Sequence, residues 1–203
     1  ELQAAIISSG IHSGYRVLGI DPAAGGDKSA VVLKSGNFQQ VLFNQQLQNT
    51  MDLVSVVQDA YRDWQCDMIV IDKTGVGQGV YDRLKQMDYP VKGISFGEKA
   101  EDEMFANMKA ELHWRERKWI LSGGRLLQDY GWNEFEIVKY KNKDGKIAIQ
   151  PKEELLREGM ASPNVVDAAV LTQFVGDTSI KSARVLKAQG NQFYDKTIEI
   201  WRG

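Results

Sequence analysis

The stretch VLGIDPAAGGDKSAVVL, residues 17–33, decides the fold. Its first four residues are apolar, as is typical of a buried strand, and residues 30–33 form a second apolar run. Asp21 stands where the first strand ends, before Pro22 and a loop that contains Gly25 and Gly26. A buried carboxylate is costly unless it is paired with a cation or bound to a metal ion. The stretch therefore predicts two neighbouring strands and raises the question of what Asp21 binds.

Outward from this stretch, the sequence alternates between predicted strands and helices. Strands are expected at 16–21, 29–34, 38–47, 67–72, 91–96, 134–141 and 146–150. Helices are expected at 51–64, from the glycine-rich turn at 75–79 to about residue 87, at 101–121 and at 152–158. A last helix is expected with Ser162 as its N-cap and Pro163 at its first helical position. The first three strands favour an antiparallel meander and the later alternation favours parallel strands. We therefore expect an α/β fold with a mixed sheet flanked by helices.

The composition limits the classes of protein that this chain can belong to. It has 203 residues, of which 43% are hydrophobic and 26% charged, as in an ordinary soluble domain. One cysteine excludes an intramolecular disulfide and a cysteine-based zinc cluster, and fits a reducing compartment. No apolar run approaches the roughly 18 residues of a membrane span, and no signal peptide is expected. The net charge of −2 means that nucleic-acid binding would depend on a local patch or on metal ions.

We expect three segments along the chain. Residues 1–15 contain several serines and glycines and are predicted to be a linker or N-terminal extension. Residues 16–176 are expected to form the folded domain, and residues 177–203 a polar C-terminal tail.

Two further aspartates join Asp21 as candidate ligands. Asp72 ends the apolar stretch DMIVID, and Asp167 interrupts an apolar helix. In mixed sheets ligands collect at the carboxyl ends of strands, and neighbouring strands lie about 4.8 Å apart. Three such carboxylates favour an all-oxygen site for Mg²⁺ or Mn²⁺. Taken singly, Asp21 fits a turn residue, Asp72 a cap of the glycine-rich turn, and Asp167 a partner of a buried lysine.

Four motifs together resemble one family. The stretch 17–33, IVIDKTGVGQGVYDRL, FANMKAELHW and SPNVVDAAVLTQF are similar, in order and spacing, to the C-terminal nuclease domain of tailed-phage large terminase subunits. The resemblance covers about residues 16–176 and implies a ribonuclease H-like fold. It also implies that Asp21, Asp72 and Asp167 are the catalytic metal ligands. The chain departs from the family at Lys109, where the family often carries arginine.

The activity implied by this resemblance is endonucleolytic cleavage of concatemeric viral duplex DNA with little sequence preference. Two divalent ions, Mg²⁺ or Mn²⁺, would lie roughly 3.5–4 Å apart, with Asp21 bridging them and Asp72 and Asp167 on either side. No histidine is needed as a base. We expect His113 to pack in the protein or to point to solvent, and His12 to lie in the N-terminal extension.

Six lysines are candidate contacts for DNA phosphates. The densest basic run is KYKNKDGK, in which strand periodicity turns alternate residues to one side. Lysines on such a hairpin can equally protect an exposed strand edge from aggregation. Lysines close to the aspartates can also compensate the carboxylates when no metal is bound. The candidates are Lys73, Lys109, Lys139, Lys141, Lys143 and Lys152.

The resemblance also implies partners and a location. They are double-stranded DNA, a small terminase subunit, the portal and procapsid, and an N-terminal ATPase domain absent from this chain, in the cytoplasm of the host cell. The chain has no P-loop of its own. Three alternatives remain open: a Holliday-junction-resolvase-like nuclease, an actin/hexokinase-like ATP-binding domain, and a catalytically idle packaging-interaction domain.

Overall fold

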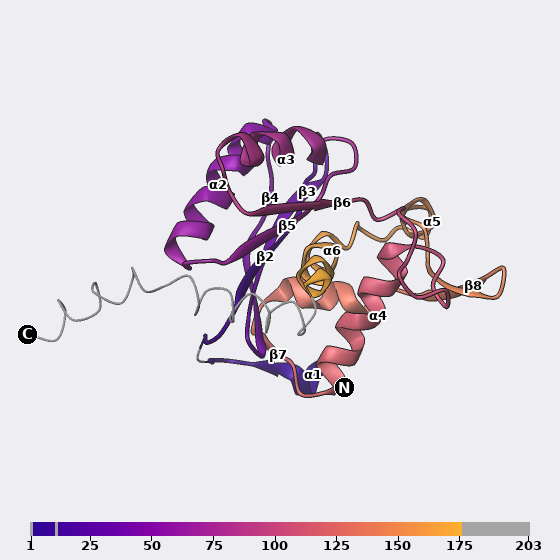
Figure 1. Ribbon diagram of the computed structural model, residues 1–203. Coiled ribbons are helices and arrows are strands. Elements are labelled where there is room, and N and C mark those ends of the chain that lie inside the picture. Colours follow the sequence, from indigo (N-terminus) through magenta and orange to yellow (C-terminus); the bar gives the residue numbers. More distant parts are fainter. Residues whose placement is uncertain (1, 11, 176–203) are drawn as a thin grey trace, which may run out of the picture.

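A seven-stranded mixed sheet runs through the middle of the molecule (Figure 1), for which a computed structural model describes residues 2–10 and 12–175. The strand order is β1-β7-β4-β3-β2-β5-β6. The strands are β1 (Ile6–Ile7), β2 (Arg16–Asp21), β3 (Lys28–Ser35), β4 (Phe38–Gln46), β5 (Met68–Asp72), β6 (Val91–Ile94) and β7 (Arg125–Leu127). β2, β3 and β4 form the predicted antiparallel meander, and β5 and β6 continue it in parallel beyond β2. The predicted fold class is confirmed.

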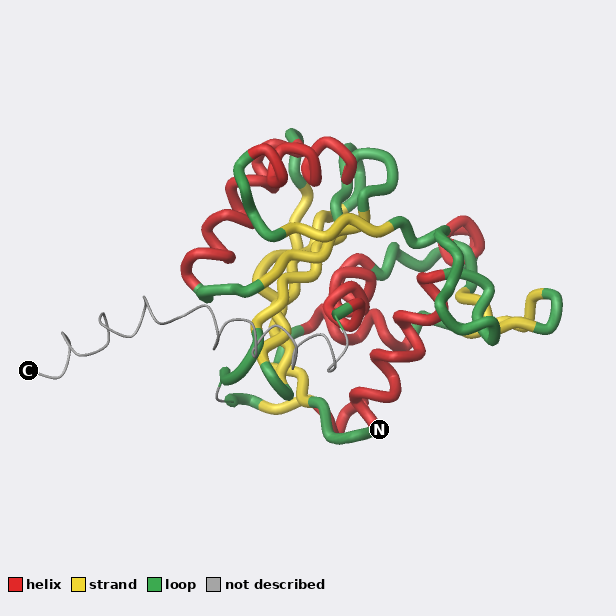
Figure 2. The backbone as a smooth tube through the Cα atoms, viewed as in Figure 1, coloured by secondary structure: helices red, strands yellow, loops and turns green. Residues whose placement is uncertain are grey.

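Helices cover both faces of this sheet. Figure 2 shows α2 and α3 on one side and α4 and α6 on the other. The helices are α1 (Leu2–Ala5), α2 (Thr50–Asp63), α3 (Gly77–Gln86), α4 (Met108–Leu121), α5 (Lys152–Arg157) and α6 (Asn164–Leu171). Two 3₁₀ helices, η1 (Tyr130–Glu136) and η2 (Thr172–Phe174), complete the set, and no described helix is long and apolar enough to cross a membrane.

The alternation of side chains along the strands decides which face of the sheet carries the acids. In β2, Ile20 belongs to the core under α2 and α3, whereas Val17 belongs to the core under α4 and α6. Asp21 has the parity of Val17 and therefore faces α6. In β5, Val70 also belongs to the core under α6, so Asp72 faces the same way. Both strand-end carboxylates thus point to the side on which α6 lies.

Helix α6 packs directly on β2 because Gly19 has no side chain. A Cβ atom at Gly19 would lie 2.0 Å from the carbonyl oxygen of Ala168, well inside van der Waals contact. This close approach brings the first turn of α6, which carries Asp167, next to the carboxyl end of β2. The glycine in the opening stretch therefore sets the distance between two of the candidate ligands.

The N-terminal segment differs from the predicted linker. Residues 2–5 form α1, in which Ala5 is buried, and Ile6 and Ile7 pair in parallel with Leu126 and Leu127. The linker prediction is therefore wrong for residues 2–7, because two apolar residues are enough to add an edge strand to β7. The predicted tail 177–203 lies outside the described residues.

The long helix starts later than predicted, at Met108 instead of residue 101. The Glu111 carboxylate accepts hydrogen bonds from the backbone N–H groups of Glu101 and Asp102, at 2.7 and 3.2 Å. It thereby holds residues 101–102 outside the helix, and Asn107 caps the first turn by accepting from the Ala110 N–H group at 3.0 Å.

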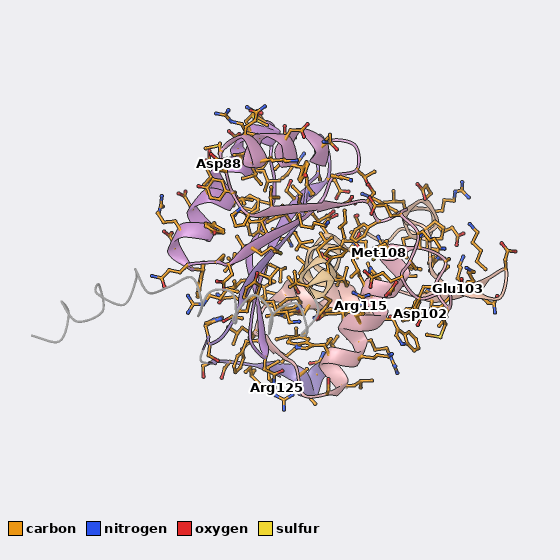
Figure 3. The ribbon with its side chains drawn as sticks, viewed as in Figure 1. Asp88, Asp102, Glu103, Met108, Arg115 and Arg125 are labelled. Carbon is orange, nitrogen blue, oxygen red and sulfur yellow. The ribbon has the colours of Figure 1, made fainter. Side chains whose placement is uncertain are left out.

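The predicted hairpin is present but shorter. It consists of β8 (Tyr140–Lys143) and β9 (Lys146–Ile149) and projects from the body (Figure 1). Residues 130–136, the start of the predicted first arm included, form η1 instead. Figure 3 shows Asp102, Met108 and Arg115 on the side of the molecule that carries this hairpin.

Helix α6 begins at Asn164, one residue later than the predicted first helical position at Pro163, and its cap is different. Pro163 occupies the N-cap position and offers no side-chain acceptor, and Ser162 is not the cap. Instead, the Glu134 carboxylate accepts hydrogen bonds from the N–H groups of Val165 and Val166, at 2.7 and 3.2 Å. η1 therefore supplies the acceptor that the helix needs at its N-terminus.

Candidate metal centre

The carboxyl ends of β2 and β5 place two of the predicted ligands side by side. Ile20 pairs with Ile71 in parallel register, and each is followed by an aspartate, Asp21 and Asp72. Both aspartates are partly exposed. Since adjacent strands lie about 4.8 Å apart, two like charges meet at this edge of the sheet.

Asp167 approaches the same edge from the first turn of α6 and is 7% exposed. The pKa of Asp21 lies well above its ordinary value, first because the carboxyl group is buried and then because Asp167 and Asp72 repel its charge. The structure therefore brings all three predicted aspartates into one electrostatic neighbourhood, in which ionisation of Asp21 is disfavoured.

Two residues of α4 hold the Asp167 carboxylate. The Lys109 ammonium donates to Oδ2 at 2.7 Å, and the His113 ring nitrogen Nε2 lies 3.2 Å from Oδ1. Burial would raise the pKa of Asp167, but Lys109 and His113 outweigh it and hold this pKa below its ordinary value. Burial lowers the pKa of His113. Because an ionised carboxylate can only accept hydrogen bonds, the Nε2–H group of His113 is the donor to Asp167.

Asp72 is fixed by its own turn. Its Oδ1 atom accepts hydrogen bonds from the backbone N–H and the hydroxyl group of Thr74, at 2.9 and 2.7 Å. Gly77 is the first residue of α3 and packs against the backbone of Asp72. A Cβ atom at Gly77 would lie 1.9 Å from the carbonyl oxygen of Asp72. The glycine-rich turn after β5 thus orients Asp72 with one carboxylate oxygen engaged by the turn.

The chemistry of these donors fits a divalent cation. In residues 2–10 and 12–175, no three acidic, histidine or cysteine side chains are already gathered closely enough to hold an ion. Both carboxylate oxygens of Asp167 are in contact with Lys109 and His113. Lys109 is the cation that compensates this acidic cluster, and its pKa is raised because Asp167 outweighs the effect of burial. A hard divalent ion bound by carboxylate oxygens would supply the same compensation more strongly.

A basic groove adjoins the acidic cluster. It has a volume of about 730 Å³ and lies between the hairpin, the start of α5 and the start of α4. Five lysines line it, together with the acids Asp144 and Glu154. They are Lys109, Lys141, Lys143, Lys146 and Lys152. Four of these were predicted as phosphate contacts, whereas Lys146 was not.

Besides Lys109, two of the groove lysines have carboxylate partners. Lys141 forms an ion pair with Glu154, and Lys152 forms one with Asp27, in the loop after β2. The amide of Asn164 also donates to Asp27, at 2.8 Å. This links the loop to the first residue of α6.

The remaining two predicted lysines are not among the residues that line the groove. Lys139 pairs with Glu158 at 3.0 Å, and Lys73 pairs with Glu98 at 3.5 Å. All four side chains are at least one-third exposed, so these pairs are weak.

His113 is the site residue that the sequence prediction missed. It was expected to pack or to face solvent, but it is buried and contacts a candidate ligand. A signal was present in the sequence, since Lys109 and His113 are spaced i, i+4 and therefore share one face of a helix.

No protein-family profile matches the sequence, and no curated protein matches it. Solved structures do match its fold. The nuclease domain of the large terminase subunit gp2 of bacterial virus Sf6 has a TM-score of 0.72 at 17% identity, over 84% of this chain and 94% of that chain. A mutant of that domain, with manganese and β-thujaplicinol, has a TM-score of 0.70 at 17% identity, over 80% and 89%.

The large terminase nuclease from thermophilic phage G20c with bound magnesium is also similar. Its TM-score is 0.63 at 14% identity, over 84% of this chain and 93% of that chain. The chain therefore has the ribonuclease H-like fold of phage terminase nuclease domains, as the resemblance implied.

Proposed function

We propose that this chain is a divalent-metal-dependent endonuclease domain of a phage packaging terminase, which cuts concatemeric viral duplex DNA with little sequence preference. The observation that carries the proposal is that Asp21 interacts electrostatically with both Asp167 and Asp72, beside a groove lined by lysines. The fold supports it, because solved structures that share the fold are terminase nucleases, one of them with bound magnesium.

The three aspartates would hold two ions, Mg²⁺ or Mn²⁺. Bound divalent ions supply the Lewis acidity that phosphodiester hydrolysis requires at the attacking water and at the leaving oxygen. The protein's part is to fix the ligands: the turn at Thr74 orients Asp72, and His113 contacts one oxygen of Asp167. Lys109 neutralises Asp167, and a bound ion would supply the same positive charge.

The basic groove would hold the DNA backbone. Lys109 lines the groove and also contacts Asp167, so a phosphate bound there lies next to the acidic cluster. Lysine ammonium groups contact phosphates without reading bases, which supports cleavage with little sequence preference. Lys141, Lys143, Lys146 and Lys152 are the proposed phosphate contacts along the groove, whereas Lys73 and Lys139 are secondary candidates outside it.

A terminase would bring further partners to this domain. We propose an N-terminal ATPase domain in the same protein, a small terminase subunit, and the portal of the procapsid, all meeting in the host cytoplasm. The names of the structural neighbours support this context, because they describe nuclease domains of large terminase subunits.

The test is plasmid cleavage by the 203-residue chain with Mg²⁺, with Mn²⁺ or with EDTA. Asp21→Asn and Asp167→Asn remove one ligand each, and both are expected to lose nicking and linearisation. Asp88→Asn is the matched control, because Asp88 is an exposed aspartate far from the groove (Figure 3). It should cleave as the wild type does.

The outcomes separate the alternatives. Cleavage of linear duplex with no preference for a four-way junction supports the terminase reading over a resolvase. Selective cleavage of junctions contradicts it. If the folded wild-type chain cleaves with neither metal, the catalytic proposal is wrong. This result would favour ATP binding or a purely structural packaging role.

A further inference from the structure

His113 contacts the acidic cluster and also lines a pocket further along α4. Its side chain is 2% exposed, and its Nε2 atom faces Asp167 Oδ1 at 3.2 Å. The pocket has a volume of about 310 Å³ and is lined by His113, by Arg117 and Glu136, and mainly by apolar side chains of α1, α4 and the segment after η1. The imidazole ring therefore contacts a candidate metal ligand on one side and a mostly apolar pocket on the other.

The two oxygens of Asp167 have partners of different character. Lys109, on Oδ2, is a flexible chain that is 22% exposed and reaches the basic groove. His113, on Oδ1, is an enclosed ring on a rigid helix. A cation or a phosphate that arrives from the groove can displace the lysine, whereas the ring is buried and does not line the groove.

We propose that His113 is a positioning residue for the metal centre. Its Nε2–H group holds Oδ1 of Asp167, so that Oδ2 is the oxygen presented to the ion when Lys109 leaves. This inference rests on the proposed function, since it assumes that Asp167 binds a metal ion. His113 does not touch the ion or the DNA; it acts by fixing the rotation of a carboxylate in which both oxygens would otherwise be equivalent.

A purely structural histidine would have a different consequence. It would satisfy a buried hydrogen bond and contribute to stability, but its removal would leave the metal affinity of the folded protein unchanged. A positioning residue changes metal affinity, because a rotating carboxylate loses orientational freedom when the ion binds. Comparable hydrogen-bond partners of metal ligands typically account for about tenfold to hundredfold in affinity.

The experiment measures Mn²⁺ binding to the full chain, by the electron paramagnetic resonance signal of unbound Mn²⁺ at neutral pH. His113→Leu keeps the volume and removes the donor, so its Mn²⁺ dissociation constant should rise about tenfold to hundredfold. His113→Gln places an amide N–H group close to the position of Nε2 and should restore binding to within about threefold of wild type, well short of that loss. His12→Leu, at the only other histidine, should bind Mn²⁺ as wild type does.

Circular dichroism in EDTA verifies that each variant is folded. If His113→Leu fails to fold, His113→Asn replaces it: its amide is too short to reach Asp167 and should bind weakly, while His113→Gln binds well. Equal Mn²⁺ affinity in wild type and in the folded Leu or Asn variant overturns the inference. Absence of Mn²⁺ binding by the wild type overturns the proposed function itself, and the inference with it.

Discussion

Removing the Lys109 charge tests whether this lysine compensates the acidic cluster in the metal-free protein. Lys109→Met retains an unbranched stem in contact with Phe96, over whose ring the ammonium now lies at 5.0 Å, but removes the cation from Asp167. Asp167 then remains buried among other carboxylates without its counter-ion. Breaking a largely buried ion pair from one side costs about 3–5 kcal/mol. For a domain of this size that corresponds to a loss of about 6–20 °C in Tm.

The assay is thermal unfolding in EDTA and in saturating Mg²⁺ or Mn²⁺. A divalent ion supplies the missing positive charge, so the difference in Tm between wild type and variant should shrink when metal is present. The loss also depends on pH, since Lys109 holds the pKa of Asp167 below its ordinary value. The contribution of this pair is complete above the pKa of an unfolded aspartate and disappears as pH falls through the lower folded value.

Lys73→Met is the matched control. Lys73 directly follows Asp72, but its partner Glu98 is 3.5 Å away and both side chains are more than one-third exposed. We expect Lys73→Met to lose less than about 1 kcal/mol of folding free energy, and this loss should be the same with and without metal. A Lys109→Met variant as stable as wild type in EDTA, or one that metal stabilises no more than wild type, would refute the reasoning.

Three further substitutions test the surroundings of the site. Burial raises the pKa of Glu116 to about 7, so ionising this side chain should cost about 3 kcal/mol of folding free energy. In urea unfolding, the stability of the wild type should therefore fall from pH 5 to pH 8, and that of Glu116→Gln should fall less. An equal dependence on pH in the two proteins would contradict this. Gly19→Ala forces a Cβ atom against Ala168 and should destabilise the chain by more than about 3 kcal/mol and weaken Mn²⁺ binding, while Gly26→Ala, with nothing within 4 Å, should be nearly neutral in the same assays. Glu134→Ala removes the acceptor at the N-terminus of α6 and should cost about 1–2 kcal/mol in urea unfolding, with a smaller loss for Glu134→Gln; equal losses would argue against a capping role.

The parts of the fold that the sequence predicted are those with a strong local pattern. The strands that end at Asp21 and Asp72 are apolar runs of several residues, and their parallel pairing follows from the alternation of strands and helices. β1 and β7 were missed because strands of two and three residues carry no periodicity. β7 pairs with the free edge of β4, and β1 then pairs with β7, so both strands depend on tertiary contacts.

The errors at the helix ends have a common physical cause. The start of α4 depends on Glu111, which binds the backbone of residues that precede the helix. The cap of α6 comes from Glu134, some thirty residues earlier in the sequence. Such acceptors act through tertiary contacts, and capping rules consider only the neighbours along the chain.

The position of the three acids in the fold was predictable, whereas most of the contacts around them were not. Each acid stands out because it interrupts or ends an apolar run. The role of His113 depends on which helix packs against α4, and the partners of Lys141 and Lys152 depend on where α5 and the loop after β2 come to lie. Neither can be inferred from spacing alone.

The placement of Asp167 on the last described α-helix has a consequence for the protein during its synthesis. Asp21 and Asp72 leave the ribosome first, and about 95 residues separate Asp72 from Asp167, which at roughly 5–20 residues per second takes about 5–20 seconds. Throughout that interval the nascent chain carries two acids of the set and lacks the helix that packs on Gly19. Under the proposed function, an unfinished chain would therefore lack one of the three acids that cleavage needs, and the site would be complete only after α6 has been made.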